Sequence, residues 1–343
     1  MSAPSPDPAL ARRARIIRRT VGLVAALVVL YLFLPSIGEV LSAWPRLAHL
    51  TLVWIGVAVL AEAASFACVW WLLSLALRSK NWFAISTSQL AGHALSRVVP
   101  AGAAPGAALQ YRMLAASGID AASAGSALTA VTLLQLATLS AIPVLSLVLS
   151  LSGQPINRGL QEAAWIGLGF FVVLMAVGAV LVTSDRAVST LGRAIQAVRN
   201  HVRRHGAAVR DFPRRLRDER NLVRQALGEK WVTALLATVG KWAFDYGALL
   251  ASLAAVGAKP NPGLVLLAYA ASQVLGMIPI TPGGLGFVEA GLTGVLALAG
   301  VSAGDAVLAT LGYRLVSFWM PLPGGLIAYA LFRRRYRAEL KAA

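Results

Sequence analysis

Residues 278–289 read IPITPGGLGFVE and lie inside one of the most apolar parts of the chain. Two prolines and three glycines break an ordinary membrane helix, because proline lacks an amide donor and glycine is a poor helix former. A broken backbone at membrane depth leaves polar groups that only protein or a water-filled cavity can satisfy. Glu289 closes the stretch, and an ionisable group in a membrane points to function. The stretch therefore predicts a polar site inside a bilayer.

The composition of the 343-residue chain is typical of a polytopic membrane protein. Hydrophobic residues make up 58% of it and charged residues only 13%, about half the charged share of soluble domains. A single cysteine, Cys68, excludes an internal disulfide and a cysteine-rich metal site. About 20 apolar residues span a bilayer. The apolar runs occupy residues 21–34, 50–77, 119–151, 163–183, 231–257, 262–280, 287–300 and 303–332.

The basic residues indicate how the chain is oriented. With the N-terminus inside, 24 Lys and Arg residues lie on the cytoplasmic side and three, Arg46, Arg158 and Lys259, on the other. The positive-inside rule therefore predicts a multi-pass protein of the cell membrane with both termini cytoplasmic. This placement argues against nucleic acid as the reason for the net charge of +17. Residues 12–34 resemble a secretory signal, but no small-residue cleavage site follows, so we favour an uncleaved first helix.

One sizeable segment, residues 185–230, is too polar for the membrane. Apolar residues recur there at spacings of three and four, with arginines on the other side, which predicts an amphipathic helix. It either anchors to anionic headgroups or docks a partner. His201 and His205 stand one helical turn apart, but no nearby acid or cysteine completes a metal site. We divide the chain into a basic tail at 1–20, a transmembrane domain at 21–332 and a basic tail at 333–343.

An internal repeat relates residues 98–128 to residues 278–311. Both stretches begin with a hydrophobic residue before proline and continue through a loop rich in proline, glycine or alanine. Each then carries a short segment with one charge, Arg112 or Glu289, and a long helix. Under the predicted topology the first loop enters from the cytoplasm and the second from outside. Opposite orientations of one unit are the inverted-repeat pattern of transporters.

The predicted fold is an all-α bundle of about six full transmembrane helices plus two broken re-entrant hairpins. Repeat one covers about residues 50–151 and repeat two about residues 231–332. Hydropathy alone counts eight helices, since residues 262–280 and 287–300 can also be read as two crossings. Both interpretations leave the C-terminus cytoplasmic.

Few charges lie within the apolar runs, and each is costly in lipid unless it faces protein or a cavity. Lys241 and Asp245 are spaced i,i+4 on one helix, so they either neutralise each other or belong to a polar pathway. Glu62 is alone in its helix. These three residues are the candidates for ion or proton coupling. His93 stands near the first hairpin, where we expect an interfacial hydrogen-bonding role.

Glu289 and Arg314 form the leading pair of candidates for substrate contact. Backbone amides of the glycine-rich loop can hold an anion, and the planar fork of an arginine suits phosphate. The pair therefore fits a phosphate headgroup with a cationic or hydroxyl part, or it is a structural bridge between the hairpin and the last helix. In the first copy Arg97 and Arg112 flank the hairpin. Arg112, with Gln110 and Tyr111, is the expected counterpart of the pair, or Arg112 simply lies at the cytoplasmic interface.

The run at residues 278–291 resembles the hallmark of the flippase-like transmembrane domain of lysylphosphatidylglycerol synthases. The same resemblance extends to GVSA at 300–303, to Tyr313-Arg314 and to WMPLPGG at 319–325. It implies movement of modified phospholipids or other lipid-linked molecules between leaflets. The first hairpin departs from the family pattern, because residues 105–112 read PGAALQYR and lack the usual acid. The candidate substrate-binding residues are Thr281, Pro282, Gly283, Gly284, Gly286, Glu289, Tyr313, Arg314, Gln110 and Arg112.

The leading functional hypothesis is translocation of a phospholipid or lipid-linked headgroup, with membrane lipids as partners and no metal or cofactor. No P-loop motif is present, so we expect no ATP hydrolysis by this chain. A non-transporting partner of a lipid-modifying synthase or glycosyltransferase is the second hypothesis. A lipid-phosphate transferase is the third, and it lacks an aspartate-rich metal motif or a nucleophile–base set. No soluble aminoacyl-transfer domain follows residue 343, so we expect no lipid aminoacylation by this chain alone.

Overall fold

A computed structural model describes four stretches of the chain and a few single positions between residues 165 and 221. The four stretches are residues 51–99, 103–150, 228–277 and 281–339. Several sequence predictions lie outside the described residues: the tail at 1–20, the helix at 21–34, most of the run at 163–183, nearly all of the segment at 185–230, residues 278–280 and the end at 340–343.

The described residues form helices and helical turns, and no strand occurs among them. The α-helices are α2 (Leu52–Leu77), α3 (Trp82–Val98), α4 (Ala103–Ala116), α5 (Ala121–Ser150), α9 (Trp231–Ala255), α10 (Pro262–Met277), α11 (Phe287–Leu298), α12 (Ala303–Arg314) and α13 (Pro321–Arg335). Short helical turns lie at η1 (Gly228–Lys230), η2 (Pro282–Gly284) and η3 (Leu315–Trp319). The all-α prediction is confirmed.

Three described helical stretches are long and apolar enough to cross a membrane: α2, residues 121–143 of α5, and residues 303–335. The 26 residues of α2 extend about 39 Å at the rise of an α-helix, which exceeds the roughly 30 Å of a hydrocarbon core. Large apolar side chains such as Leu52 and Leu60 remain exposed on its surface, as expected for a helix that faces lipid. The chain is therefore an integral membrane protein.

The last long helical stretch contains a π turn in its middle. Met320 donates its amide hydrogen to the carbonyl oxygen of Leu315 at 2.9 Å, a bond that closes over five residues. Pro321 follows at the start of α13 and has no amide hydrogen to donate. A π turn is a common way to absorb such a break, and it is frequent at functional sites. The wider turn lies directly after Arg314, the last residue of α12.

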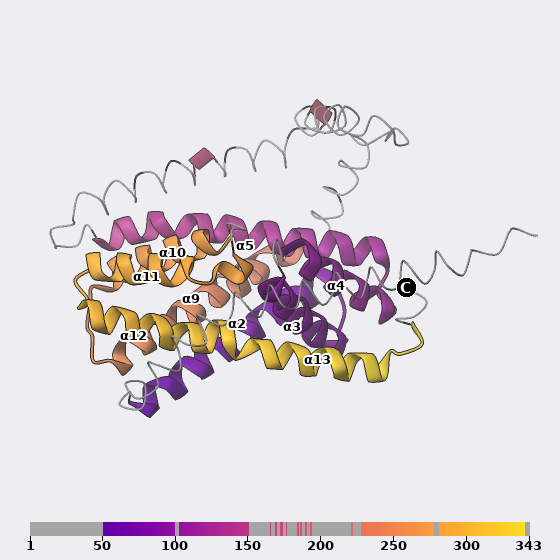
Figure 1. Cartoon of the computed structure of the whole chain (residues 1–343). Helices are drawn as coiled ribbons and strands as arrows, with labels where there is room; N and C mark the ends of the chain where they lie inside the picture. The colour runs from indigo at the N-terminus through magenta and orange to yellow at the C-terminus, as the bar shows by residue number, and fades with distance from the viewer. Residues whose placement is uncertain are drawn as a thin grey trace, which may run out of the picture.

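Two pairs of short helices lie between the long ones. The pair α3–α4 lies towards one end of the bundle and the pair α10–α11 towards the other (Figure 1). With 16 and 12 residues, α10 and α11 extend only about 24 Å and 18 Å, so neither spans a bilayer alone. These lengths favour the hairpin interpretation over two crossings. The opposite placement of the pairs agrees with the predicted inverted repeat.

The helix α3 is absent from the apolar runs of the sequence because it is polar along much of its length. Thr87, Ser88 and Gln89 are nevertheless buried, since α4 and α13 cover this helix. The first hairpin closes tightly at two glycines. A Cβ atom on Gly106 would lie 2.5 Å from the carbonyl oxygen of Gly92, so only glycine allows this approach.

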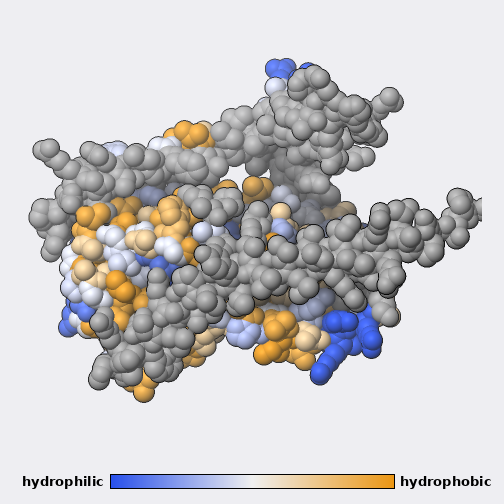
Figure 2. All heavy atoms as spheres, in the orientation of Figure 1, coloured by the Kyte–Doolittle hydropathy of each residue, from blue (hydrophilic) through white to orange (hydrophobic). Residues whose placement is uncertain are grey.

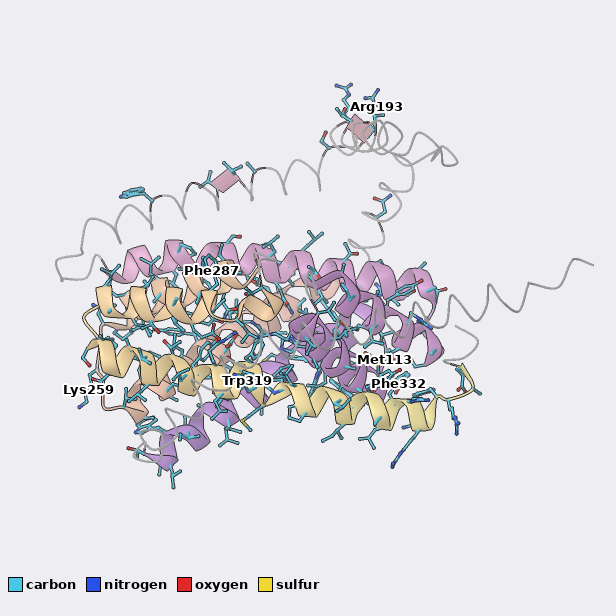
Figure 3. The ribbon with its side chains drawn as sticks, viewed as in Figure 1. Met113, Arg193, Lys259, Phe287, Trp319 and Phe332 are labelled. Atoms are coloured by element: carbon cyan, nitrogen blue, oxygen red, sulfur yellow. The ribbon has the colours of Figure 1, made fainter. Side chains whose placement is uncertain are left out.

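Apolar cores lie on both sides of the middle of the bundle. One core is built around the second hairpin and includes Leu249, Tyr269 and Leu292. The other half of the molecule holds the cores around the first hairpin, where Met113 and Phe332 lie close together in Figure 3. The polar residues of the membrane interior gather between these halves.

The basic side chains of the described helices mark one end of the bundle. Arg78 ends α2 and Lys230 precedes α9, and these two helix ends meet, since Gly228 lies beside Arg78. The last turn of α13 is basic and forms the blue corner of Figure 2. Lys259 lies at the other end (Figure 3). This asymmetry agrees with the predicted cytoplasmic face.

Candidate functional site

A cavity of about 540 Å³ lies in the middle of the bundle, where the tips of both hairpins meet. Its walls come from α2, α3, the start of α4, α5, α9, α10, η2, α11, α12 and η3. The sequence had already singled out the charges among its polar lining residues. The polar residues are Glu62, Ser65, Gln89, His93, Ser96, Arg97, Gln135, Lys241, Asp245, Ser272, Gln273, Thr281, Tyr313, Arg314 and Ser317.

The predicted pair of Glu289 and Arg314 is joined in the structure. Arg314 donates from Nε to Oε1 of Glu289 at 2.6 Å and from Nη2 to the carbonyl oxygen of Gly283 at 3.2 Å. The side chains are only 6% and 14% exposed. One guanidinium therefore ties α12 to both the start of α11 and the glycine turn. The second carboxylate oxygen of Glu289 is buried and has no hydrogen-bond partner among the described residues.

The glycine turn at η2 requires glycine for its backbone. Gly283, Gly284 and Gly286 have φ angles of +58°, +71° and +76°, a region that side chains with a Cβ atom rarely adopt. A Cβ atom on Gly283 would overlap the ring of Phe318 and lie 2.9 Å from the carbonyl oxygen of Arg97. The tip of the second hairpin thus rests directly on the end of α3, which belongs to the first hairpin.

We expect Gly283→Ala to lower the free energy of unfolding by roughly 3 kcal/mol, because it adds backbone strain and a clash with Phe318. Gly294→Ala is the matched control, since Gly294 is helical and a Cβ atom there meets nothing within 4 Å. It should leave stability unchanged or raise it by about 0.5–1 kcal/mol. Titration of the purified protein with a denaturing detergent measures both. Equal stability of the two variants would contradict the close contact.

Asp245 is the centre of a buried hydrogen-bond network. Its carboxylate accepts hydrogen bonds from Lys241 at 3.1 Å, from Tyr269 at 2.9 Å and from Tyr313 at 2.8 Å. Gln273 in turn donates to the hydroxyl of Tyr313 at 3.0 Å. The predicted pairing of Lys241 with Asp245 is present, and two tyrosines from other helices complete it. These hydroxyls and Gln273 join α9 to α10 and α12.

Glu62 and His93 face the cavity without such partners. Glu62 is 9% exposed, and its Oε2 atom has no hydrogen-bond partner in the described part of the chain. The same holds for Nε2 of His93, whose ring packs edge-on against Phe66 with centroids 5.2 Å apart. His93 therefore lines the cavity. This placement differs from the interfacial position that the sequence predicted.

Arg97 is the cation that the first hairpin contributes to the cavity. Its guanidinium carbon lies 5.1 Å from the centroid of the Phe318 ring, and that of Arg314 lies 4.2 Å from the same centroid. Cation–π contacts of this kind hold a guanidinium in place without using its hydrogen-bond donors. Unlike Arg314, Arg97 makes no ion pair within the described residues.

The structure gathers most of the predicted site residues at this cavity and leaves two outside. Thr281, Gly283, Tyr313, Arg314, Glu62, Lys241 and Asp245 line it, Glu289 binds Arg314, and Pro282, Gly284 and Gly286 belong to the turn. Gln110 packs against Gly92, and Arg112 is exposed on α4. The tyrosine and glutamine partners, Tyr269 and Gln273, were missed. Their signal was polarity inside the apolar run 262–280.

Comparison with known proteins identifies the family. A model of the lysylphosphatidylglycerol synthase TM region matches residues 19–325, which is most of the chain. The chain belongs to this family. The match confirms the resemblance seen in the sequence and contains the glycine turn, Glu289 and Arg314. The lysylphosphatidylglycerol synthase TM region therefore forms this cavity in the present chain.

Two relatives in Methanothermobacter thermautotrophicus are described as UPF0104 membrane proteins. One is 33% identical over 98 residues, which is 29% of this chain and 28% of the relative. The other is 41% identical over 61 residues, 18% of each chain. The matched segments thus cover less than a third of these relatives.

Within this lysylphosphatidylglycerol synthase TM region, Arg97 takes the place in the cavity that the sequence suggested for Arg112. The reason is how far each residue lies from the start of its own helix. Glu289 is the third residue of α11, whereas Arg112 is the tenth residue of α4, about 13 Å from the start of its helix. Arg97 precedes the break in the first hairpin, close to the cavity.

We expect Arg112→Ala to leave the free energy of unfolding within about 0.5 kcal/mol of wild type, because Arg112 is exposed and lies outside the cavity. Detergent-induced unfolding of the purified variant measures the effect. A loss of several kcal/mol would contradict the exposed position of Arg112.

Proposed function

We propose that this protein moves the headgroup of a phospholipid or lipid-linked molecule between membrane leaflets through the central cavity. The observation that carries the proposal is a polar cavity, lined by charged side chains, at the junction of two hairpin tips within a membrane bundle. Buried charges in a membrane are costly and mark pathways or binding sites. A path of this kind lowers the free-energy barrier for a polar headgroup.

The size of the cavity supports a headgroup as cargo and not a whole lipid. About 540 Å³ lies within the usual range of small-molecule pockets, roughly 300–1,000 Å³. Acyl chains remain in lipid in this proposal, and only the polar part enters. The opposite placement of the two hairpins (Figure 1) supplies a gate towards each leaflet.

The orientation and the energy source belong to the same proposal. We place the basic end, with Arg78 and the last turn of α13, in the cytoplasm of a cell membrane. Transport is downhill or coupled to protons. Since Lys241 and Asp245 neutralise each other, Glu62 is the acid best placed for coupling.

Translocation in proteoliposomes tests the proposal. Fluorescent phospholipids and a polyprenyl-phosphate lipid are reconstituted with wild type, Glu289→Gln or Glu339→Gln, and movement is read by quenching from one side. Glu339 is an exposed acid and serves as the matched control. We expect movement in wild type and in the control, and about tenfold slower movement in Glu289→Gln, since one charged hydrogen bond is weakened.

Two results would contradict the proposal in different ways. Absence of movement for every lipid would reject translocation. Equal movement in wild type and Glu289→Gln would reject the site at the second hairpin.

A further inference from the structure

The helices α2 and α3 face each other in an antiparallel register that can be followed turn by turn. Trp70 donates from Nε1 to Oε1 of Gln89 at 3.1 Å. One turn further into the bundle, the rings of Phe66 and His93 are in contact, with centroids 5.2 Å apart. Each step moves four residues back along α2 and four forward along α3, as expected for neighbouring antiparallel helices.

The next pair in this register is Glu62 with Arg97. Both residues line the cavity, and they have opposite charges. Yet no hydrogen bond or ion pair joins them, although the two preceding pairs are in contact. At this third position of the register the two side chains, an acid and a base, are therefore not joined to each other.

The other charges of the cavity are already compensated. Lys241 binds Asp245 at 3.1 Å, and Arg314 binds Glu289 at 2.6 Å. Within the part of the chain that the structure describes, Glu62 and Arg97 are thus the cavity's acid and base without an ion-pair partner. Taking unpaired charges out of water is expensive, so a bound group that satisfies both is strongly favoured.

We propose that Glu62 and Arg97 bind the two ends of one headgroup, a phosphodiester that carries a hydrogen-bond donor. The phosphate contacts Arg97, and an ammonium or hydroxyl group donates to Oε2 of Glu62. This inference rests on the proposed function, because it assumes that a headgroup occupies the cavity.

The surroundings of each residue fit its role. Phe318 is fully buried, and its ring makes a cation–π contact with the guanidinium of Arg97. This contact leaves the N–H donors of the guanidinium free for phosphate oxygens. Arg314 lies on the same ring, but its charge is already paired with Glu289. At the other side the free oxygen of Glu62 is an acceptor that suits a donor and not a second phosphate.

Binding of soluble short-chain lipids to the full chain in detergent tests the site without requiring transport. Dihexanoyl phosphatidylethanolamine carries the donor, whereas dihexanoyl phosphatidylcholine has the same phosphate and a quaternary nitrogen without N–H. Calorimetric titration gives the affinity of each for wild type, Arg97→Gln, Glu62→Gln and the exposed control Arg333→Gln. We expect wild type and the control to prefer the ethanolamine lipid.

The two variants should act on different parts of the headgroup. Arg97→Gln should weaken both lipids about tenfold or more, the loss typical of one charged hydrogen bond. Glu62→Gln keeps an acceptor oxygen but removes the carboxylate charge, so it should weaken the ethanolamine lipid more than the choline lipid. If Arg97→Gln does not fold, Arg97→Lys replaces it, and a loss of a few-fold for both lipids is expected because the planar fork is gone.

Three results would overturn the proposal. One is wild-type affinity of the Arg97 variant for both lipids, and another is equal weakening of both lipids by Glu62→Gln. The third is binding of inorganic phosphate as tight as that of the ethanolamine lipid, which would make free phosphate the ligand. The expected binding pattern without lipid movement in proteoliposomes would reject only the proposed function. Lipid movement with unchanged binding in both variants would reject only this site.

Discussion

Arg314→Ala should abolish lipid movement and lower the free energy of unfolding by about 3–5 kcal/mol, the cost of leaving a buried charge without its partner. Arg314 holds Glu289 at 2.6 Å and the carbonyl oxygen of Gly283 at 3.2 Å. Without Arg314, one oxygen of the buried Glu289 carboxylate loses its partner. The other oxygen already has no partner among the described residues. Denaturing-detergent titration and the proteoliposome assay measure the two effects.

A double variant separates substrate contact from structural bridging. The double variant Arg314→Met, Glu289→Leu replaces both charged side chains with apolar side chains of similar volume. Replacing a buried ion pair in this way often leaves stability unchanged or raises it. We expect stability to return close to wild type while lipid movement stays absent. Arg333→Ala, at an exposed arginine, controls for loss of a surface charge and should change stability by less than about 0.5 kcal/mol. Full movement in the double variant would make the Glu289–Arg314 pair a bridge only.

The second large effect is expected for Asp245→Asn, with a loss of about 3–5 kcal/mol in the free energy of unfolding. The carboxylate accepts from Lys241, Tyr269 and Tyr313. An amide removes the charge that Lys241 needs, and its NH₂ group cannot accept from a hydroxyl. Detergent titration of the purified variant measures the loss.

Lys241→Met combined with Asp245→Asn tests the origin of that loss. The double variant has no unpaired lysine, so it should recover most of the stability. If it is as unstable as Asp245→Asn alone, the tyrosine hydrogen bonds, and not the ion pair, hold this part of the cavity. Tyr246→Phe is a suitable control, since its hydroxyl binds the carbonyl oxygen of Pro262 outside this network.

Much of the fold followed from local properties of the sequence. Apolar runs of sufficient length predicted α2, α5 and α9, because a membrane helix satisfies all of its backbone groups internally. Proline and glycine at 278–289 predicted the break between α10 and α11 for the same reason. The helices α3 and α4 were not predicted from hydropathy, because both carry polar residues. Those in the middle of α3, Thr87, Ser88 and Gln89, are covered by other helices.

The site residues likewise divide into features that the sequence predicted and features that only the tertiary structure revealed. By itself the sequence determined which charges must be buried, and it determined the pairing of Lys241 with Asp245, since these stand one turn apart on one helix. Tertiary structure alone decided that Tyr269 and Tyr313 complete that pair and that Glu62 and Arg97 line the same cavity. The physical reason is that the facing of two helices depends on their register and on close contacts such as that of Gly283 with Phe318. Such long-range contacts leave no periodic pattern in a single chain.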